Sequence, residues 1–373
     1  MGYPERMRYR LRPLAALRAL ERTLGRAKTS LDYKRKVDAQ LRVLAGCLPV
    51  EALEVDTAAA RRFLAKRFPG YRDVRWHRFY TAASGRAAAS YLPEDAFYFH
   101  VLPRLNPPER WPLYGDKNVL HGLGVRPMPP VVARVVRGRL VDEVRRPLSR
   151  SQAQARAERA GQVVVKPARE SGAGRSVRRV AADDIAPLLD DLVAGAGDWL
   201  LEVALAQDAP VGVLNPETIN TYRVLTVRSR GALHAASTVL RVGRAGAVVD
   251  NVNAGGLMVG VDAEGFLSAR AHDGDGRPYE RHPDHGYAFA GTRAAPARLA
   301  HDAALAVHDT MPDMDLVSSD VAMTPGPRAV LLEVNVSWQG ITMHQLCRGP
   351  LFGELQDEVV RPTRVRTVLG LVV

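Results

Sequence analysis

The chain has 373 residues, and its lack of cysteine pairs and of long apolar runs already excludes several classes of protein. Its two cysteines, Cys47 and Cys347, lie far apart, so neither a disulfide framework nor a cysteine metal site is expected. We expect both to be ordinary buried thiols. No apolar run approaches the roughly 18 residues that cross a bilayer. The first 20 residues are rich in Arg and lack the apolar stretch of a secretory signal, which predicts a cytoplasmic protein.

Lysine is scarce among the positive charges. Of the 52 basic residues, six are lysines, and none follows Lys166. Because the chain uses Arg for almost every generic positive charge, an isolated Lys is a candidate for a task that a wide, planar guanidinium cannot perform. Lys117 and Lys166 are the two candidates.

The formal net charge of +12 is concentrated near the N-terminus, where the first 50 residues hold twelve basic and four acidic side chains. Between Arg6 and Arg42, basic residues alternate with Leu and Ala, which predicts an amphipathic helix with a basic face. Such a face could contact anionic lipid or nucleic acid. A solvated helix face is the simpler interpretation. We therefore expect no nucleic-acid partner, and contact with a membrane surface is the less favoured alternative.

Hydrophobic periodicity divides the chain into a helical part and a strand-rich part. Helical spacing dominates up to residue 66, apart from a break at Pro49, and strands dominate from residue 199. The later helices expected are 149–160, 183–194 and 294–310. The strands expected are 131–136, 163–166, 199–203, 221–228, 233–242, 257–261, 316–323 and 329–335.

This order of elements predicts an α+β fold with three domains. We expect a helix-rich N-terminal region at residues 1–110, a small domain at 111–198 and a larger, sheet-based domain at 199–373. Residues 105–109 have the composition of a linker.

A candidate phosphate-binding segment begins with the predicted strand at 163–166. The strand ends on Lys166, and the following loop contains the small residues Ser171, Gly172 and Gly174. A loop with few Cβ atoms lets backbone N–H groups approach an anion, and Lys supplies a compact charge for phosphate oxygens. The spacing fits neither a Walker A loop nor a dinucleotide fingerprint. A plain hairpin turn is the competing interpretation.

Oxygen-bearing side chains cluster on two predicted strands near the C-terminus. Asp320 lies on one strand, and Glu333 and Asn335 lie on the next. Residues two apart on a strand share a face, so Glu333 and Asn335 point the same way, and Asp320 can lie beside them. One or two carboxylates with substrate phosphates are the usual ligands of Mg²⁺. The solvated face of an edge strand is the competing interpretation.

Taken together, these motifs resemble the ATP-grasp superfamily, and most closely its sugar-transfer-associated, glutamate-ligase-like branch. The resemblance implies two α+β subdomains that grip ATP, preceded by the helical N-terminal region, with ATP and Mg²⁺ as cofactors. The residues that it assigns to the nucleotide are Lys117, Lys166, Ser171, Gly172, Gly174, Glu202 in the strand that meets adenine, and Gln207 at the ribose. The metal ligands that it implies are Asp320, Glu333 and Asn335.

The resemblance also covers segments 220–226, 238–243 and 250–256. It implies that two arginines hold the transferring phosphoryl group, although surface charge is the alternative for any Arg. The residues implied in catalysis are Arg223, Arg241 and Asn251, and those implied close to the same intermediate, on the substrate side, are Gly255 and Gly256. The composition of the loop that contains His282 makes this residue a further substrate-side candidate, with an ordinary polar loop as the competing interpretation. Asp250 either orients Asn251 or ends a strand.

The function implied by the resemblance is ATP-dependent ligation of a carboxylate to an amine through an acyl phosphate. The substrate expected is an amino acid or a sugar acid in a biosynthetic pathway. A second hypothesis is a kinase-like transfer of the phosphoryl group to a stable small-molecule or glycan acceptor. A third is a basic module that binds nucleic acid or a membrane surface without catalysis.

Overall fold

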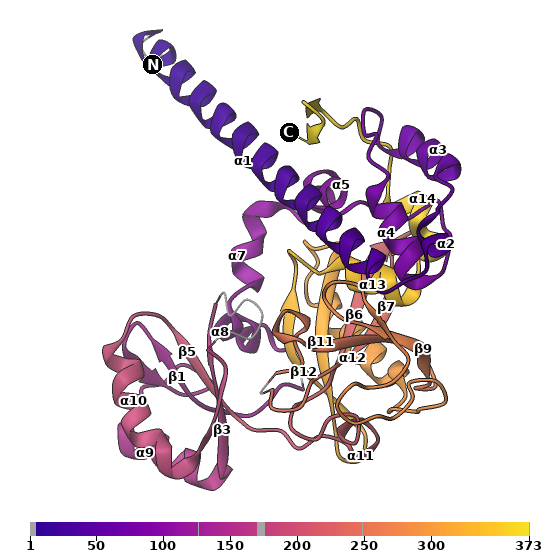
Figure 1. Cartoon of the computed structure of the whole chain (residues 1–373). Coiled ribbons are helices and arrows are strands. Elements are labelled where there is room, and N and C mark those ends of the chain that lie inside the picture. Colours follow the sequence, from indigo (N-terminus) through magenta and orange to yellow (C-terminus); the bar gives the residue numbers. More distant parts are fainter. Residues whose placement is uncertain (1–4, 126, 170–175, 248, 373) are drawn as a thin grey trace. The chain divides into compact units, whose positions relative to one another are not determined.

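Figure 1 shows a computed structural model of the chain, which describes residues 5–125, 127–169, 176–247 and 249–372. Its contacts define two compact units, residues 1–104 with 356–373 and residues 105–355. Within the described ranges, no helix has both the length and the apolar character needed to cross a membrane. The predicted phosphate-loop residues Ser171, Gly172 and Gly174 lie outside the described residues.

The first unit is mainly helical. Its long helix α1 (Glu5–Ala45) agrees with the predicted N-terminal helix, and Pro49, the predicted break, is the N-cap of α2. The other elements are α2 (Val50–Leu53), α3 (Ala58–Arg67), α4 (Arg75–Ser84), α5 (Glu94–Ala96), a π-helix (Phe97–Val101), α6 (Leu102–Leu105), α14 (Gln356–Val359), β13 (Thr367–Val368) and β14 (Leu371–Val372).

The two cysteines differ in their surroundings. Cys347 is buried on α13 (Ile341–Arg348), as expected. The expectation was wrong for Cys47, which is exposed. The reason is local, because α1 ends at Ala45 and Cys47 lies in the exposed turn that follows.

A buried carboxylate lies inside the first unit. Asp95 is fully buried and accepts hydrogen bonds from the Tyr71 hydroxyl at 2.7 Å and the Ser30 hydroxyl at 3.5 Å. Burial raises the pKa of Asp95 from 3.8 to about 6, and the hydrogen bond from Tyr71 offsets only part of this rise.

We expect the stability of this unit to depend on the protonation of Asp95. Its pKa is higher in the folded chain, so its stabilising contribution is complete below pH 3.8 and is lost as the pH rises through about 6. A shift of this size corresponds to about 3 kcal/mol. The free energy of unfolding of the wild type relative to Asp95→Asn should therefore fall between pH 4 and pH 7 in urea titrations. Asp32→Asn, at an exposed carboxylate of α1, is the control. A pH-independent difference would contradict the assignment.

The second unit contains two antiparallel sheets, of which the smaller has the strand order β2-β1-β5-β3-β4. Its strands are β1 (Val131–Val136), β2 (Arg139–Val141), β3 (Gln162–Pro167), β4 (Arg178–Ala181) and β5 (Trp199–Val203). Apolar side chains of α9 (Arg150–Ala160) and α10 (Ile185–Ala194) share its core, and Ser149 with Gln152 forms a capping box at the start of α9.

One strand differs from the expected division of domains. We expected residue 199 to open the large domain, but β5 pairs with both β1 and β3 and lies in the middle of the small sheet. The three middle residues of β5 are buried, which matches this central position. The C-terminal residues 356–373 also group with the first unit.

The larger sheet has the strand order β10-β9-β8-β7-β6-β11-β12. Its strands are β6 (Thr221–Ser229), β7 (Ala232–Val242), β8 (Leu257–Val261), β9 (Leu267–His272), β10 (Pro278–Tyr279), β11 (Leu316–Thr324) and β12 (Arg328–Asn335). The remaining helices of the unit are α7 (Trp111–Tyr114), α8 (Lys117–Leu120), α11 (Ala209–Gly212), α12 (Ala297–Asp309) and α13.

The two faces of the larger sheet have different roles. Alternate residues such as Tyr222, Val224 and Leu240 form the main apolar core with α12. The residues between them, among them Arg223 and Arg241, lie on the other face, because successive strand residues point to opposite sides. The sheet therefore places a row of buried polar side chains opposite its apolar core.

Candidate functional site

A cleft of about 930 Å³ lies within the second unit, lined by strands of both sheets. Most of the predicted site residues that the structure describes meet there, although they come from segments more than 200 residues apart. Those that line the cleft are Lys117, Lys166, Glu202, Arg223, Arg241, Asn251, Asp320, Glu333 and Asn335.

The three predicted metal ligands lie side by side on β11 and β12. Asp320 is directly opposite Glu333, and Ser318 is opposite Asn335, so the three oxygen-bearing side chains share one face. The register then shifts, because Val321 pairs with Leu331 and leaves Leu332 as an extra residue in β12. This bulge turns the strand beside the carboxylates and directs the Leu332 carbonyl towards Lys166, which donates to it at 3.4 Å.

The two predicted lysines reach the same strand from different directions. Lys117 begins α8, which Asp116 caps by accepting from the Asn118 N–H. Its backbone N–H donates to Ala168 at 2.9 Å, and its ammonium lies 3.5 Å from Glu333. Lys166 comes from the end of β3. Two compact positive charges therefore border the carboxylate cluster, as the sequence predicted.

Glu202 is the counter-ion of Lys166. Its carboxylate is buried, 2.6 Å from the Lys166 ammonium and 3.1 Å from His121 Nε2. Burial alone would raise the pKa of Glu202, but the Lys166 charge and the His121 contact hold it below its ordinary value. The carboxylate is thus engaged within the protein. The nearby cleft wall is formed by Val203, Ala204 and Leu205, a largely apolar surface that suits the face of a purine.

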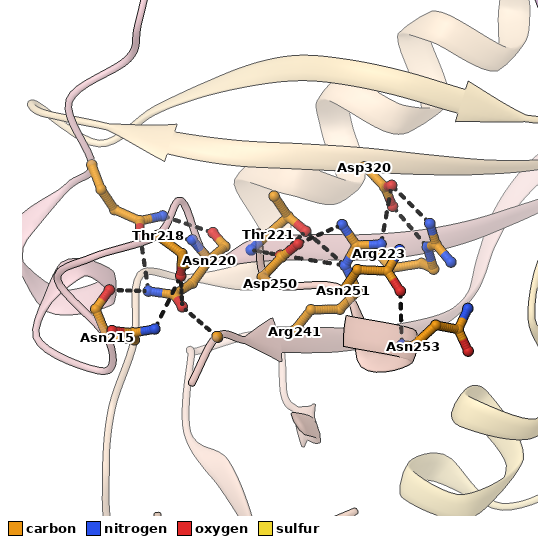
Figure 2. A network of polar contacts seen from close by, with 12 residues as sticks. Asn215, Thr218, Asn220, Thr221, Arg223, Arg241, Asp250, Asn251, Asn253 and Asp320 are labelled. Atoms are coloured by element: carbon orange, nitrogen blue, oxygen red, sulfur yellow. Dashed lines mark hydrogen bonds and ion pairs between the residues drawn. The ribbon is translucent and has the colours of Figure 1, made fainter. Parts of the chain in front are cut away.

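Four buried charged residues alternate on the cleft side of the larger sheet, three of them on β6, β7 and β11 and one, Asp250, in the segment after β7, as Figure 2 shows. Arg223 binds Asp320 through two hydrogen bonds of 2.7 Å, and Arg241 Nη1 lies 3.3 Å from the same carboxylate. Arg241 also donates to Asp250 at 2.8 Å and 3.3 Å. Burial alone would raise the pKa of Asp320, but the two guanidinium groups hold it well below its ordinary value.

Asp250 has a role that the sequence did not indicate. Besides binding Arg241, it accepts from the Thr221 N–H at 2.9 Å and from the Thr221 hydroxyl at 2.5 Å (Figure 2). It therefore fixes Arg241 against β6 and does not orient Asn251. The Asn251 side chain instead accepts from the Asn253 N–H at 2.9 Å.

Gln207, expected at the ribose, is absent from the described cleft lining. Its amide donates to the Asn220 carbonyl at 2.7 Å and accepts from the Asn220 N–H at 2.8 Å and side-chain nitrogen at 3.0 Å. The side-chain oxygen and one N–H of Gln207 are thus engaged with Asn220, so the geometry gives the ribose expectation no support. This pairing is non-local, and no local sequence pattern indicates it.

We expect Gln207→Ala to lower stability without weakening nucleotide binding. The change leaves the buried Asn220 N–H without its acceptor, at a cost of about 1 to 3 kcal/mol. Thermal unfolding should report this loss, while calorimetric titration with the ATP analogue AMP-PNP should give an affinity within about twofold of wild type. Weaker AMP-PNP binding at unchanged stability would contradict this prediction and support the expected contact between Gln207 and the ribose.

The substrate-side candidates Gly255, Gly256 and His282 are also absent from the described cleft lining. A Cβ at Gly256 would lie 2.4 Å from the Asp250 carbonyl oxygen, so this glycine permits a tight loop. His282 is fully buried, shares a hydrogen bond of 3.0 Å with the Gly243 carbonyl and accepts from two backbone N–H groups at 3.3 Å. Both ring nitrogens are occupied, so His282 is a structural residue.

Three residues in or near the cleft were not predicted. His121 lies behind the cleft wall and contacts Glu202, and Thr221 lines the cleft and contacts Asp250. Trp338 lines the cleft with 56% of its surface exposed, three residues after Asn335. Its backbone φ of 53° is unusual for a bulky residue, and such conformations gather at functional sites. The exposure and backbone angle of Trp338 are not readable from composition or spacing.

The donor set fits Mg²⁺ better than a transition metal. Among the residues that the structure describes, no group of three or more His, Cys, Asp or Glu side chains could hold a metal ion. Asp320 and Glu333 nevertheless face each other, with Asn335 beside them, and this smaller set of hard oxygen donors is enough for an ion that also takes phosphate and water ligands.

Comparison with known proteins agrees with this geometry. Residues 184–358 match the sequence model of a family described as sugar-transfer associated ATP-grasp. No curated protein matches the chain.

Three similar solved structures are D-alanyl-alanine synthetase A from Vibrio cholerae O1 biovar eltor, D-cycloserine synthetase DcsG and an L-amino acid ligase from Bacillus licheniformis. The first is 16% identical, with a TM-score of 0.37 over 65% of this chain and 61% of its own. The second is 15% identical, with a TM-score of 0.40 over 68% of this chain and 72% of its own. The third is 12% identical, with a TM-score of 0.38 over 68% of this chain and 49% of its own. This chain thus spans less than two thirds of the first structure's length.

Because these TM-scores are low, the more informative finding is the family match. It includes β5, the whole larger sheet and α13, and therefore both arginines and all three metal-ligand candidates. The chain thus resembles the sugar-transfer-associated ATP-grasp family over this segment, which is a little under half of its length.

Proposed function

We propose that the chain is an ATP-dependent carboxylate–amine ligase that acts through an acyl phosphate in a cytoplasmic biosynthetic pathway, on an amino acid or a sugar acid. The observation that carries this proposal is the meeting of two lysines, two buried arginines and three oxygen donors in one cleft. In this set the lysines suit a polyphosphate, the oxygen donors suit a divalent cation, and the arginines suit a second anion.

Each group has a part in the proposed reaction. Lys117 and Lys166 would neutralise phosphate charge, and Asp320, Glu333 and Asn335 would hold Mg²⁺, which when bound offsets charge on the β- and γ-phosphate oxygens. Arg223 and Arg241 would bind the substrate carboxylate or the transferring phosphoryl group. One preorganised contact of this kind is typically worth about 3 kcal/mol of barrier.

The proposed reaction has two balanced steps. A carboxylate oxygen of the substrate attacks the γ-phosphorus, the bond between this phosphorus and the β,γ-bridging oxygen breaks, and ADP leaves. The amine nitrogen then attacks the acyl carbon, the acyl carbon–oxygen bond breaks, and phosphate leaves as the amine loses a proton. In a kinase-like reaction the second step would be missing.

Hydroxylamine trapping tests the acyl phosphate. The protein would be incubated with ATP, Mg²⁺, hydroxylamine and a pool of amino acids and uronic acids, and the products read by mass spectrometry. A hydroxamate formed together with ADP is the expected product. A stable phosphoester would favour the phosphotransferase, and AMP would indicate an adenylate intermediate. Both outcomes would overturn the proposal.

Matched lysine variants connect this reaction to the cleft. Lys166→Met should form no hydroxamate, because the charge beside the phosphates is lost. Lys66→Met, at an exposed lysine of α3 outside the cleft, should behave as wild type. Equal loss in both variants would separate the activity from this site.

A further inference from the structure

The two cleft arginines are held in different ways. Arg241 lies between two carboxylates, Asp250 and Asp320, whereas the bidentate contact of Arg223 is with Asp320 alone (Figure 2). All four side chains are at least nine-tenths buried. These side chains therefore form a row of alternating charges in the order Asp250, Arg241, Asp320 and Arg223, and this row includes the candidate metal ligand Asp320.

Asp250 is a fixed partner for Arg241. Besides the guanidinium, it accepts the backbone N–H and the hydroxyl of Thr221, and the Arg241 Nε atom donates to this hydroxyl at 3.0 Å. Such a network holds each member in one geometry, because removing any contact leaves a buried polar group unsatisfied.

Asp320 is in a different position. Both of its oxygens face Arg223, yet it also lies opposite Glu333, where two carboxylates make a favourable place for a cation. Arg223 occupies both oxygens of Asp320 and Arg241 Nη1 lies 3.3 Å from one of them, so a cation must compete with guanidinium groups for the lone pairs of this carboxylate. Gly340, at a φ of 76°, lies close to Arg223, and a Cβ at this position would be 3.7 Å from the Arg223 Nη1 atom. Gly340 therefore borders the guanidinium without a side chain of its own.

We propose that Arg223 and a divalent cation exchange at Asp320, while Arg241 stays fixed by Asp250. Without a cation, Arg223 is the counter-ion of Asp320. When the cation binds, Arg223 is released towards the anionic substrate, so the site completes its anion-binding arginine pair only after metal loading. Arg241 keeps one position with and without the cation and binds the anionic substrate there, and Asp250 is its positioning residue. This inference rests on the proposed function, because it takes Asp320 for a metal ligand.

Mn²⁺ binding to the full-length protein tests the exchange. Free Mn²⁺ would be measured by electron paramagnetic resonance at pH 7.5, without nucleotide. Arg223→Gln removes the competing charge and should bind Mn²⁺ at least tenfold more tightly than wild type. Arg228→Gln, the same substitution on the same strand but outside the cleft, should match wild type. Arg223→Lys keeps the charge but not the two parallel hydrogen bonds, and should bind with an intermediate affinity.

The Asp320→Asn variant distinguishes a failure of the proposed exchange from a failure of the proposed metal site. It should abolish Mn²⁺ binding at this site in both the wild-type and the Arg223→Gln backgrounds. If it does, and neither Arg223 variant binds Mn²⁺ more tightly than wild type, the exchange is wrong and the metal site stands. If Asp320→Asn leaves Mn²⁺ affinity unchanged, the metal site of the proposed function is wrong, and the exchange falls with it.

Discussion

Replacing Glu333 with Gln is expected to weaken the binding of Mg²⁺ with AMP-PNP by on the order of 100-fold, because second-sphere changes alone cost 10- to 100-fold in metal affinity. Glu333 faces Asp320 and lies 3.5 Å from the Lys117 ammonium, so the substitution removes both a proposed metal ligand and the partner of a proposed phosphate-binding lysine. Titration calorimetry with AMP-PNP, in the presence and absence of Mg²⁺, measures the effect.

The control for this prediction is Glu264→Gln, at an exposed turn between β8 and β9. It should bind AMP-PNP with wild-type affinity at every Mg²⁺ concentration. The Glu333→Gln variant should lose most of the Mg²⁺ dependence of binding, because the ligand set is broken. Unchanged dependence on Mg²⁺ in Glu333→Gln would place the metal elsewhere.

The second large effect is expected for Lys166→Met, which should destabilise the second unit by about 3 to 5 kcal/mol as well as abolish nucleotide binding. The cause is Glu202, a buried carboxylate that lies 2.6 Å from Lys166. Without the ammonium, its charge has no cationic partner of comparable strength. Chemical unfolding followed by near-ultraviolet circular dichroism measures the loss.

The double variant Lys166→Met with Glu202→Gln separates the two roles of the lysine. Removing the unpaired charge should restore most of the stability, but AMP-PNP should still not bind. If the double variant is as unstable as Lys166→Met, the cost does not come from the uncompensated carboxylate.

The pH dependence of unfolding gives an independent reading of this ion pair. In the wild type the pKa of Glu202 is below its ordinary value of 4.5, so its stabilising contribution is present above that pH and is lost as the pH falls below it. In Lys166→Met burial dominates and the pKa of Glu202 rises above 4.5, so its contribution is lost as the pH rises instead. The free energy of unfolding of the wild type should therefore exceed that of Lys166→Met by an amount that grows from pH 4 to pH 7.

Local signals in the sequence predicted most elements of the second unit. The expected strands and helices agree with the structure to within a few residues, and the expected Ser149 cap of α9 is present. Such features depend on side-chain periodicity and on neighbours a few residues away. The position of β5 was harder, because its place in the small sheet depends on pairing with strands that lie 30 to 70 residues earlier in the chain.

The residue types of the candidate site were readable, but their partners were not. Scarce lysines and spaced carboxylates made Lys117, Lys166, Asp320 and Glu333 candidates, because few other residue types bind phosphate or Mg²⁺. The Lys166–Glu202 pair depends on the register in which Val164 is opposite Glu202, and this register is set by tertiary packing. For the same reason the sequence could not distinguish a ligand-binding Gln207 from one that holds Asn220.

The central claim is that one triphosphate lies between Lys117, Lys166 and the oxygen donors of β11 and β12. A crystal structure of the full-length protein with AMP-PNP and Mg²⁺ tests it most directly. We predict phosphate oxygens within hydrogen-bonding distance of both ammonium groups and a Mg²⁺ ion on Asp320, Glu333 and Asn335. Ordered AMP-PNP bound outside this cleft, with both lysines and both carboxylates still paired only with protein, would contradict the account.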